Sequence, residues 1–434
     1  MLRTFGNAWK IPELRKKLLF TALIILIYRI GSALPVPFVD IAMRGDGLFG
    51  ADANTFLTYL SMMTGNAFNY GTLFALSITP YINASIIIQL LCVAIPYLER
   101  LSKEGEEGQK KLATITRYTT VGLALVQGIA YFIYLSETNS LTVNKTGHLW
   151  FAGFVIVLAL TAGSAVVMWL GEQIDVKGIG NGISVLLFAG ILSRGPQAFG
   201  ALWTYWTEYK RYFAVIGIVI AFLLVIAFIV WMTHAERRIP VQYAKQTAAM
   251  AAKSGSAASR IGGVRQYIPL KVNAAGVMPI IFAQAIMFIP LSVLPFVASD
   301  ETVQTVQNFM NLNSWQYNVV FAFLIIVFTY FYTAIQFNPI EISNNMKRNG
   351  GFVPGIRPGK PTSDFINKVV VKITLAGAIF LGLIAILPQL TGKVIGYPLA
   401  MGGSSLLIMV GVALETVKQI ESQMLMRHYK GFLD

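Results

Sequence analysis

The chain has 434 residues, of which 55% are hydrophobic and only 12% are charged. A soluble domain carries about 25% charged residues, so this composition excludes an ordinary water-soluble protein and indicates one whose main solvent is lipid. The formal net charge of +14 could suggest nucleic-acid binding, but an excess of Lys and Arg in cytoplasmic loops explains such a charge in a membrane protein.

Residues that bind metals or form disulfides are scarce. Cys92 is the only cysteine, so an internal disulfide or a cysteine-based metal site is impossible. The three histidines, His148, His234 and His428, lie far apart and lack the spacing of metal ligands. We predict no metal and no cofactor.

A membrane-spanning helix needs about 20 mostly apolar residues, and the chain contains ten candidates. The first follows a basic N-terminus, as a signal peptide would, but it is too long for a signal sequence, contains Arg29 and ends in LPVP, so we predict a retained span. The fifth is short and could be re-entrant. In chain order the candidates are residues 18–36, 73–95, 118–135, 149–170, 179–192, 213–232, 272–297, 317–337, 369–387 and 398–417.

The segment 56–68, FLTYLSMMTGNAF, precedes the second candidate span. It is too short to cross the membrane and too apolar for an ordinary outer loop. It could be a short helix at the membrane interface or a segment that folds back into the membrane.

The distribution of cations tests this topology. With the N-terminus in the cytoplasm, 27 of the 34 Lys and Arg residues fall in cytoplasmic segments, six fall in outer segments and Arg29 lies within a span. This asymmetry predicts ten spans with both termini cytoplasmic. Omitting the fifth span would invert every later loop and abolish the asymmetry, so we predict that this span is real.

Two of the predicted cytoplasmic loops are long, residues 233–271 and 338–368. The first contains the small-residue stretch AAMAAKSGSAASRIGG, which predicts a flexible tip, and the second contains GGFVPGIRPGKP, which predicts a series of turns. Their basic residues could reflect topology alone. Their length favours a function, because connections longer than about 15 residues are usually functional or disordered.

A weak internal repeat relates the second and seventh spans. SITPYINASII aligns with GVMPIIFAQAI, so Pro80 matches Pro279 and Ile82 matches Ile281. The two spans run in opposite directions in the predicted topology, as an inverted repeat requires. We expect each proline to weaken the hydrogen-bond ladder inside its spanning helix, so that bending there costs less.

The predicted spans offer little chemistry. Of the twenty Asp and Glu residues, only Glu415 lies inside a span, and no GxxxxGK[ST] loop is present. A proton-driven pump, an intramembrane hydrolase and a P-loop nucleotide hydrolase are therefore disfavoured, and we predict no enzymatic activity. What remains is a path closed by apolar side chains. Ile78 with Ile82, and Leu187 with Ile191, each share one helix face, although packing or lipid contact would give the same spacing.

Six stretches, taken in order over nearly the whole chain, resemble the SecY family of protein-conducting channels. They are ALSITPYINASIIIQLL, WLGEQIDVKGIGNGISVLLFAGI, ERRIPVQYAK, PLKVNAAGVMPIIFA, FNPIEISNNMKRNGGFVPGIRPGKPT and MGGSSLLIMVGVALE. The resemblance implies an all-α polytopic membrane protein with ten transmembrane helices. They would form two inverted five-helix halves, residues 1–200 and 201–434, around an hourglass pore.

The resemblance also implies roles for particular residues. A ring of aliphatic side chains would close the waist of the pore: Ile78, Ile82, Leu187, Ile191, Ile281 and Ile408. The segment 56–68 would be a plug on the outer side of the ring, with Phe56, Leu57, Leu60, Met62, Met63, Gly65 and Phe68. A lateral gate between the second and seventh spans would release signal sequences into lipid, and its residues would be Pro80, Asn83, Gln89, Gln127, Asn273, Pro279 and Gln284.

The two long loops would then be docking surfaces. Their candidate contact residues are Arg237, Arg238, Lys253, Arg260, Arg265, Lys347, Arg348, Arg357 and Lys360. The partners implied are the SecA motor ATPase, the ribosome, small membrane subunits resembling SecE and SecG, signal sequences, unfolded secretory chains and membrane lipids. The implied location is the plasma (inner) membrane. A secondary transporter and a structural scaffold are the alternatives; the first needs ion-coordinating groups at mid-membrane and the second has no need of the Gly/Pro-rich loops.

We predict that replacing Asn273 or Gln127 by Leu shifts the balance between the closed and open gate. Hydrogen bonds between side chains in a membrane are worth about 0.6–2 kcal/mol, and a signal sequence gains about 0.8 kcal/mol for each methylene it buries. Losing one bond should therefore change the acceptance of weak signal sequences, measured by their export. Unchanged export by both variants would contradict the prediction.

Overall fold

The computed structural model is mostly helical. It describes residues 9–39, 61, 64–137, 140–142, 149–210, 212–243, 266–273, 275–297, 305–306, 309, 314–395 and 403–430. The chain divides into two compact units. The first unit comprises Met1–Ile218, Gln284–Asn318 and Pro388–Asp434, and the second comprises Val219–Ala283 and Val319–Leu387.

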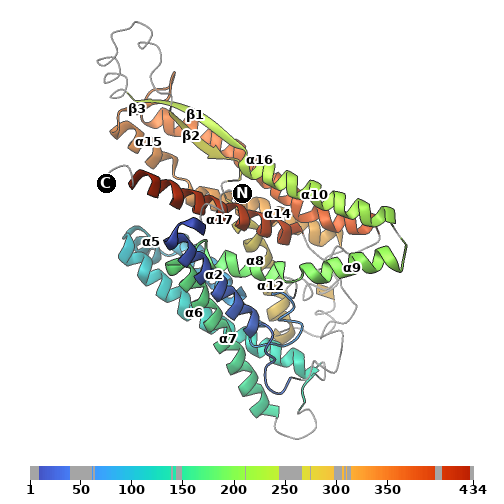
Figure 1. Ribbon diagram of the computed structural model, residues 1–434. Helices are drawn as coiled ribbons and strands as arrows, with labels where there is room; N and C mark the ends of the chain where they lie inside the picture. Colours follow the sequence, from blue (N-terminus) through green and yellow to red (C-terminus); the bar gives the residue numbers. More distant parts are fainter. Residues whose placement is uncertain are drawn as a thin grey trace. The chain divides into compact units, whose positions relative to one another are not determined.

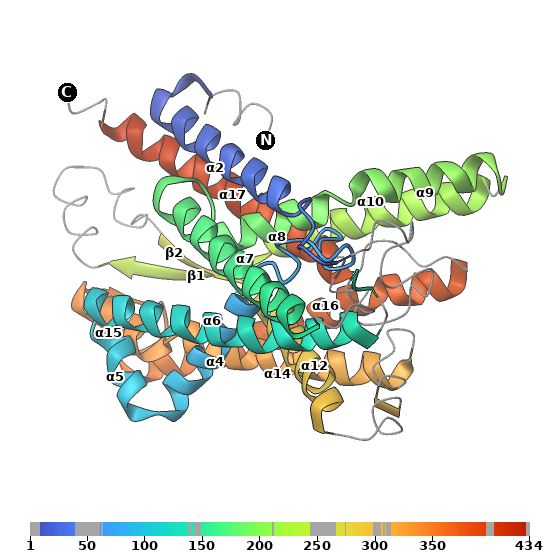
Figure 2. The ribbon, with the colours of Figure 1, turned by 90° about the horizontal axis from the view of Figure 1, so that it is seen from below.

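The first unit is a bundle of helices (Figure 1). Its elements are α2 (Pro12–Gly31), α4 (Thr79–Ala94), α5 (Pro96–Lys103), α6 (Glu106–Glu137), α7 (Leu149–Lys177), α8 (Gly182–Leu192), α9 (Gly195–Thr207) and α17 (Gly403–Lys430). Helix α6 packs against α4 and α7, and α8 packs against α7 and α17. Figure 2 shows α2 beside α17, where Leu14, Ile179 and Ile420 form a buried cluster.

The second unit combines apolar helices with a small sheet. Four helices have residues in both units: α10 (Tyr212–His234), α12 (Met278–Val297), α14 (Trp315–Gln336) and α16 (Lys360–Ile395). The remaining elements are β1 (Glu236–Tyr243), β2 (Gln266–Lys271), α15 (Pro339–Arg348) and β3 (Gly351–Phe352). The sheet has the antiparallel order β2-β1-β3, with Ile239 opposite Ile268. One face of β1 buries Ile239 and Val241 in a cluster with Met346 and Ile366.

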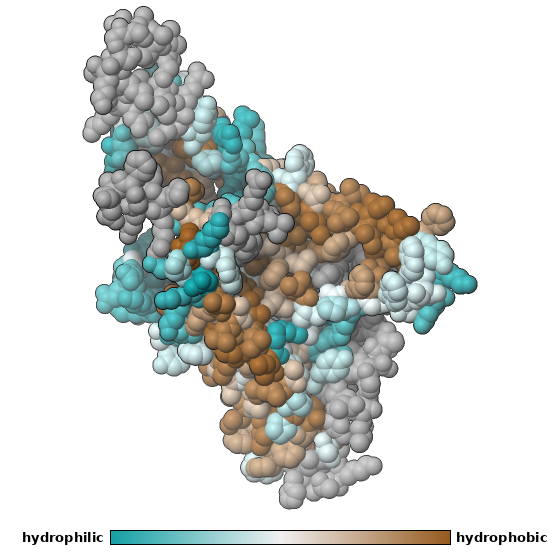
Figure 3. Space-filling view, in the orientation of Figure 1, coloured by the Kyte–Doolittle hydropathy of each residue, from teal (hydrophilic) through white to brown (hydrophobic). Residues whose placement is uncertain are grey.

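Each of the ten predicted segments overlaps a described helix. Only some of these helices are long and apolar enough to span a membrane by themselves. Six helices among the described residues qualify as spans, and a seventh would be the pair α4 and α5, which is bent by 103°. The six are Glu106–Ser136, Leu149–Lys177, Gly182–Thr207, Tyr212–His234, Trp315–Arg348 and Lys360–Leu387. Figure 3 shows apolar side chains covering α10 and, within the first unit, α2 and α7.

The fifth span is longer than its predicted limits of 179–192. Helix α8 ends at Leu192, but α9 follows after Ser193 and Arg194, and the two together form one candidate span. By length and composition this candidate span includes Arg194, which was predicted to lie in an outer loop.

The prediction that the two prolines weaken the middle of their helices is wrong. Residues 73–78 form turns, and α4 begins at Thr79, so Pro80 lies in its first turn. Helix α12 begins at Met278, so Pro279 is its second residue. The first N–H groups of a helix have no acceptor within it, and a proline there removes no hydrogen bond. The two prolines instead start their helices at matching positions.

The turn between α7 and α8 is fixed by side chains from three helices. Asp175 Oδ1 accepts a bond from the Gly182 N–H at 2.7 Å. Thr21 Oγ1 of α2 accepts from the Ile179 N–H at 3.1 Å, and Gln419 Oε1 of α17 accepts from the Gly180 N–H at 2.9 Å. Buried backbone donors need such partners, because unpaired ones are costly in an apolar setting. The turn therefore fixes where α8 begins, and with it the positions of the residues along α8.

Gly182 is also needed where α8 crosses α7. A Cβ added to Gly182 would collide with the backbone oxygen of Gly171. We predict that Gly182→Ala forces the helices apart and costs about 1–3 kcal/mol, the range found for overpacked sites. Thermal unfolding of the purified protein in detergent should show a lower Tm. Gly200→Ala is the matched control, because a Cβ there meets nothing within 4 Å; equal Tm values for the two variants would refute the prediction.

Candidate functional site: aliphatic ring and plug segment

The six residues predicted to form the ring are all buried. Their exposed fractions are 1% for Ile78 and Ile408, 2% for Ile191, 4% for Leu187, and 9% for Ile82 and Ile281. By comparison, Leu192 at the end of α8 is 49% exposed. The ring residues therefore pack against protein. Five of them belong to the first unit, and Ile281 belongs to the second.

Helices α8 and α17 place their ring residues at one level. They pack together and run in opposite directions (Figures 1 and 2). Near one end of the pair, Gly180 lies beside Thr416 and bonds to Gln419. With a helical rise of about 1.5 Å per residue, Leu187 and Ile191 lie roughly 10–17 Å beyond Gly180, and Ile408 lies roughly 12–17 Å beyond Thr416 and Gln419.

Ile78 lies close to the point where α7 and α8 cross. A Cβ placed on Gly171 would be 3.6 Å from Ile78 Cδ1 and 3.7 Å from Leu186 Cδ1. Ile78 thus packs beside Gly171 of α7, at the level of Leu186, the residue before Leu187. Ile78 therefore contributes to the packing at this crossing.

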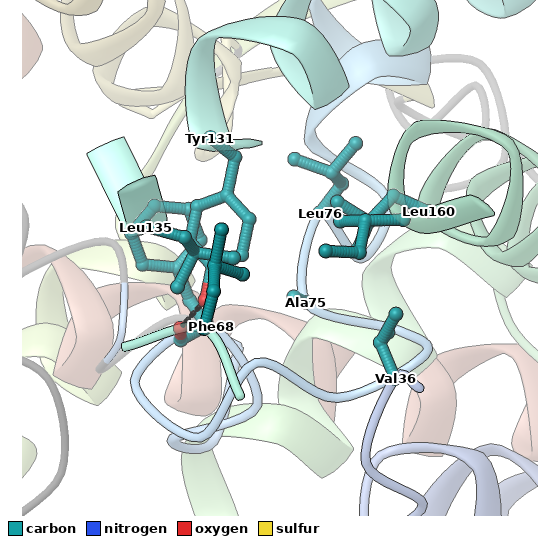
Figure 4. Packing of buried hydrophobic residues seen from close by; sticks show 9 residues of the cluster. Val36, Phe68, Ala75, Leu76, Tyr131, Leu135 and Leu160 are labelled. Atoms are coloured by element: carbon teal, nitrogen blue, oxygen red, sulfur yellow. Dashed lines mark hydrogen bonds between the residues drawn. The ribbon is translucent and has the colours of Figure 1, made fainter. Parts of the chain in front are cut away.

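The described part of the plug segment is buried and consists of turns. Phe56, Leu57, Leu60, Met62 and Met63 lie outside the described residues. Gly65 and Phe68 are described, and Phe68 is only 8% exposed. Its ring packs on Tyr131 of α6 with centroids 4.7 Å apart, and the Tyr131 hydroxyl donates a bond to the Phe68 backbone oxygen at 2.6 Å (Figure 4).

Other residues contact this segment that were not assigned to the plug from sequence. Asn66 Nδ2 donates to Gln197 Oε1 at 3.0 Å, which ties the segment to α9. A Cβ on Gly65 would lie 2.8 Å from Arg29 Nη1, so Arg29 of α2 also borders the segment. The single charge of Arg29 inside the first predicted span was the one signal in the sequence; nothing local marked Tyr131 or Gln197.

The structure describes all the polar residues that were predicted to lie at the gate. Asn83 Oδ1 and Asn273 Oδ1 are buried, and in the described part of the chain neither accepts a hydrogen bond. Gln284 is buried as well and Gln127 is half-buried. Gln89 Nε2 donates to Ser85 Oγ of its own helix at 3.3 Å. An acceptor buried without a donor costs about 1–3 kcal/mol, so both asparagines destabilise the arrangement seen here.

The candidate docking cations that are described lie at the surface of the second unit. Arg237, Arg238, Arg357 and Lys360 are exposed, and so are Lys347 and Arg348 in the last turn of α15. Arg238 Nε pairs with Glu236 Oε1 at 2.7 Å, whereas Ile239 and Val241 of the same strand face the interior. Lys253, Arg260 and Arg265 lie outside the described residues.

The described residues thus define a helical membrane protein with aliphatic side chains buried inside its spans. Among them, no group of three or more His, Cys, Asp or Glu could hold a metal ion.

Comparisons with known proteins agree with this class. A family model described as SecY matches residues 72–417. The "Protein translocase subunit SecY" of Streptomyces scabiei is 43% identical over 464 residues, with 100% of each chain covered. A solved structure described as a protein-conducting channel has a TM-score of 0.67 at 17% identity and 97% coverage of each chain. In a second, with a TM-score of 0.64 at 16% identity and 97% coverage of each chain, the plug domain of the SecY protein is said to stabilise the closed channel and maintain a membrane seal.

The curated relative matches the whole length of the chain, and the family model covers most of it. The chain therefore belongs to the SecY family.

We predict that Arg357→Glu weakens the binding of a cytoplasmic partner without disturbing the fold. Arg357 is exposed and contributes its backbone oxygen, not its side chain, to the hydrogen bond from Thr362. Co-purification with SecA should fall several-fold. Lys111→Glu makes the same charge change at an exposed position on α6 and serves as the control; equal binding by both variants would rule out this surface.

Proposed function

We propose that this chain is the pore-forming subunit of a protein translocase, which conducts unfolded secretory polypeptides across the membrane and releases apolar segments sideways into lipid. The observation that carries the proposal is the 43% identity to a protein translocase subunit along the whole chain. The burial of all six aliphatic ring residues supports it, because a constriction lined by such side chains sheds water and closes a path to ions.

In this proposal the membrane domain has ten spans in two inverted halves, residues 1–200 and 201–434, with both termini cytoplasmic, in the plasma membrane. The 27 cytoplasmic cations against six outer ones favour that topology. The matching helix starts at Pro80 and Pro279 favour the inverted relation of the second and seventh spans.

Helices α4 and α12 form the lateral gate of the proposed channel. They carry Asn83, Asn273 just before α12, and Gln284, which are polar groups in otherwise apolar surroundings. The unpaired oxygens of Asn83 and Asn273 lower the free energy needed to separate the gate. A signal sequence that replaces one wall then has less to overcome.

The free energy for transport comes from partners, since the chain has no P-loop motif. We propose SecA and the ribosome as partners of the cytoplasmic surface around Arg237 and Arg357. Small membrane subunits resembling SecE and SecG complete the complex. The channel itself is a passive conduit.

The test is reconstitution of the chain into vesicles with these small subunits and SecA, followed by protease protection of an exported precursor. The precursor should become protected only when SecA and ATP are present. In the same vesicles, Ile191→Ser and Ile408→Ser should raise the resting ion leak, because a hydroxyl in the ring retains water. Ile220→Ser is the control, since Ile220 on α10 is 53% exposed. Absent protection, or a leak that is equal in all three variants, would overturn the proposal.

A further inference from the structure

The end of the plug segment lies beside Arg29, whose Nη1 has no hydrogen-bond partner among the described residues. Gly65 has a φ of 66°, in the left-handed region that favours glycine. A Cβ on Gly65 would lie 2.8 Å from Arg29 Nη1 and 2.8 Å from the Gly190 oxygen, and it would also collide with Ser193 Oγ. Only a glycine backbone fits between α2 and the end of α8 at this point.

Specific contacts hold the segment in this docked position. The Tyr131 hydroxyl donates to the Phe68 oxygen at 2.6 Å, and Asn66 donates to Gln197 at 3.0 Å. Phe68 also fills a buried cluster with Leu135, Leu76 and Tyr131 (Figure 4). The bond from Tyr131 joins residues 63 positions apart in the chain and is fully buried.

One arginine acts against docking. Arg29 Nη1 is buried and has no hydrogen-bond partner among the residues that the structure describes. The carbonyl end of α2 lies next to this cation and offsets part of the cost through the helix dipole. The unpaired N–H groups remain costly, because a buried donor without an acceptor loses its water and gains nothing.

Undocking the segment would remove this cost. When residues 64–68 leave, water reaches the surface that they covered, and the guanidinium of Arg29 regains hydrogen bonds. The same movement breaks the bond between Tyr131 and Phe68. The docked state is thus stabilised by the Tyr131 hydroxyl on α6 and destabilised by the Arg29 guanidinium on α2.

We infer that Tyr131 and Arg29 are positioning residues that set the resting position of the plug in opposite directions: Tyr131 holds it docked and Arg29 favours its release. This inference rests on the proposed function as a channel. It concerns the balance between two positions of the segment, whereas the ring residues concern the seal itself.

Two substitutions test the signs. Tyr131→Phe removes only the hydroxyl and keeps the aromatic contact, and Arg29→Met keeps the length of the side chain but removes the charge. In vesicles that contain the chain with its small membrane subunits, Tyr131→Phe should raise the resting ion leak about two- to tenfold, as expected for one hydrogen bond. Arg29→Met should lower the leak by a similar factor, and Arg29→Lys, which restores a cation, should return it toward the original value.

A second measurement follows the segment directly. Ala67 is 1% exposed, so a thiol at this position reacts only when the segment leaves. In a background of Cys92→Ser and Ala67→Cys, a membrane-impermeant thiol reagent should label the Tyr131→Phe protein faster and the Arg29→Met protein more slowly than the parent. This readout also separates a change in plug position from partial unfolding, because general unfolding accelerates labelling in every variant.

The outcomes distinguish the inference from the function on which it rests. Vesicles that export a precursor and leak through Ile408→Ser, but in which Arg29→Met raises the leak or the labelling rate, would overturn the inference alone. Equal rates for Tyr131→Phe and the parent would do the same. Failure of export by the parent chain would instead count against the channel function.

Discussion

Three hydrogen bonds at the turn between α7 and α8 determine where the rest of the site lies. Asp175, Thr21 and Gln419 come from three helices and accept hydrogen bonds from three backbone N–H groups of one short turn. The Ile179 N–H is buried and the Gly180 and Gly182 N–H groups are partly buried, so each needs an acceptor, and the three side chains supply it. Helix α8 begins there. It carries two ring residues along its length, and the groups that contact the plug segment follow at its end.

The same structure contains polar groups that are left without partners. Asn83, Asn273, Arg29 and Arg194 each bury at least one atom that makes no hydrogen bond within the described residues. A protein selected only for stability would lose such groups, since each costs free energy that packing must offset. In a channel that has to open and close, they reduce the free-energy difference between the two states. Asn83 and Asn273 lie in or beside α4 and α12, and Arg29 lies at the plug segment; these are the parts expected to move.

In the proposed channel the site acts by shape and solvation, because the aliphatic side chains keep water out. The described spans contain no cluster suited to metal binding. The proposed partners would bind the exposed cations of the second unit, where Arg238 lies on the face of β1 opposite the buried Ile239 and Val241.

The sequence by itself determined the membrane class, the approximate positions of the helical segments, the expected orientation and the family. Hydropathy, cation bias and ordered motifs are local properties, so they can be read without neighbours. Only the tertiary structure decided that Pro80 and Pro279 start helices, that Gln89 bonds within its own helix and that α9 extends the fifth span. It also brought Tyr131 to Phe68 and Gln419 to Gly180, which are 63 and 239 positions apart. An apolar pattern states which solvent a side chain prefers; it does not state which partner a buried polar group will find.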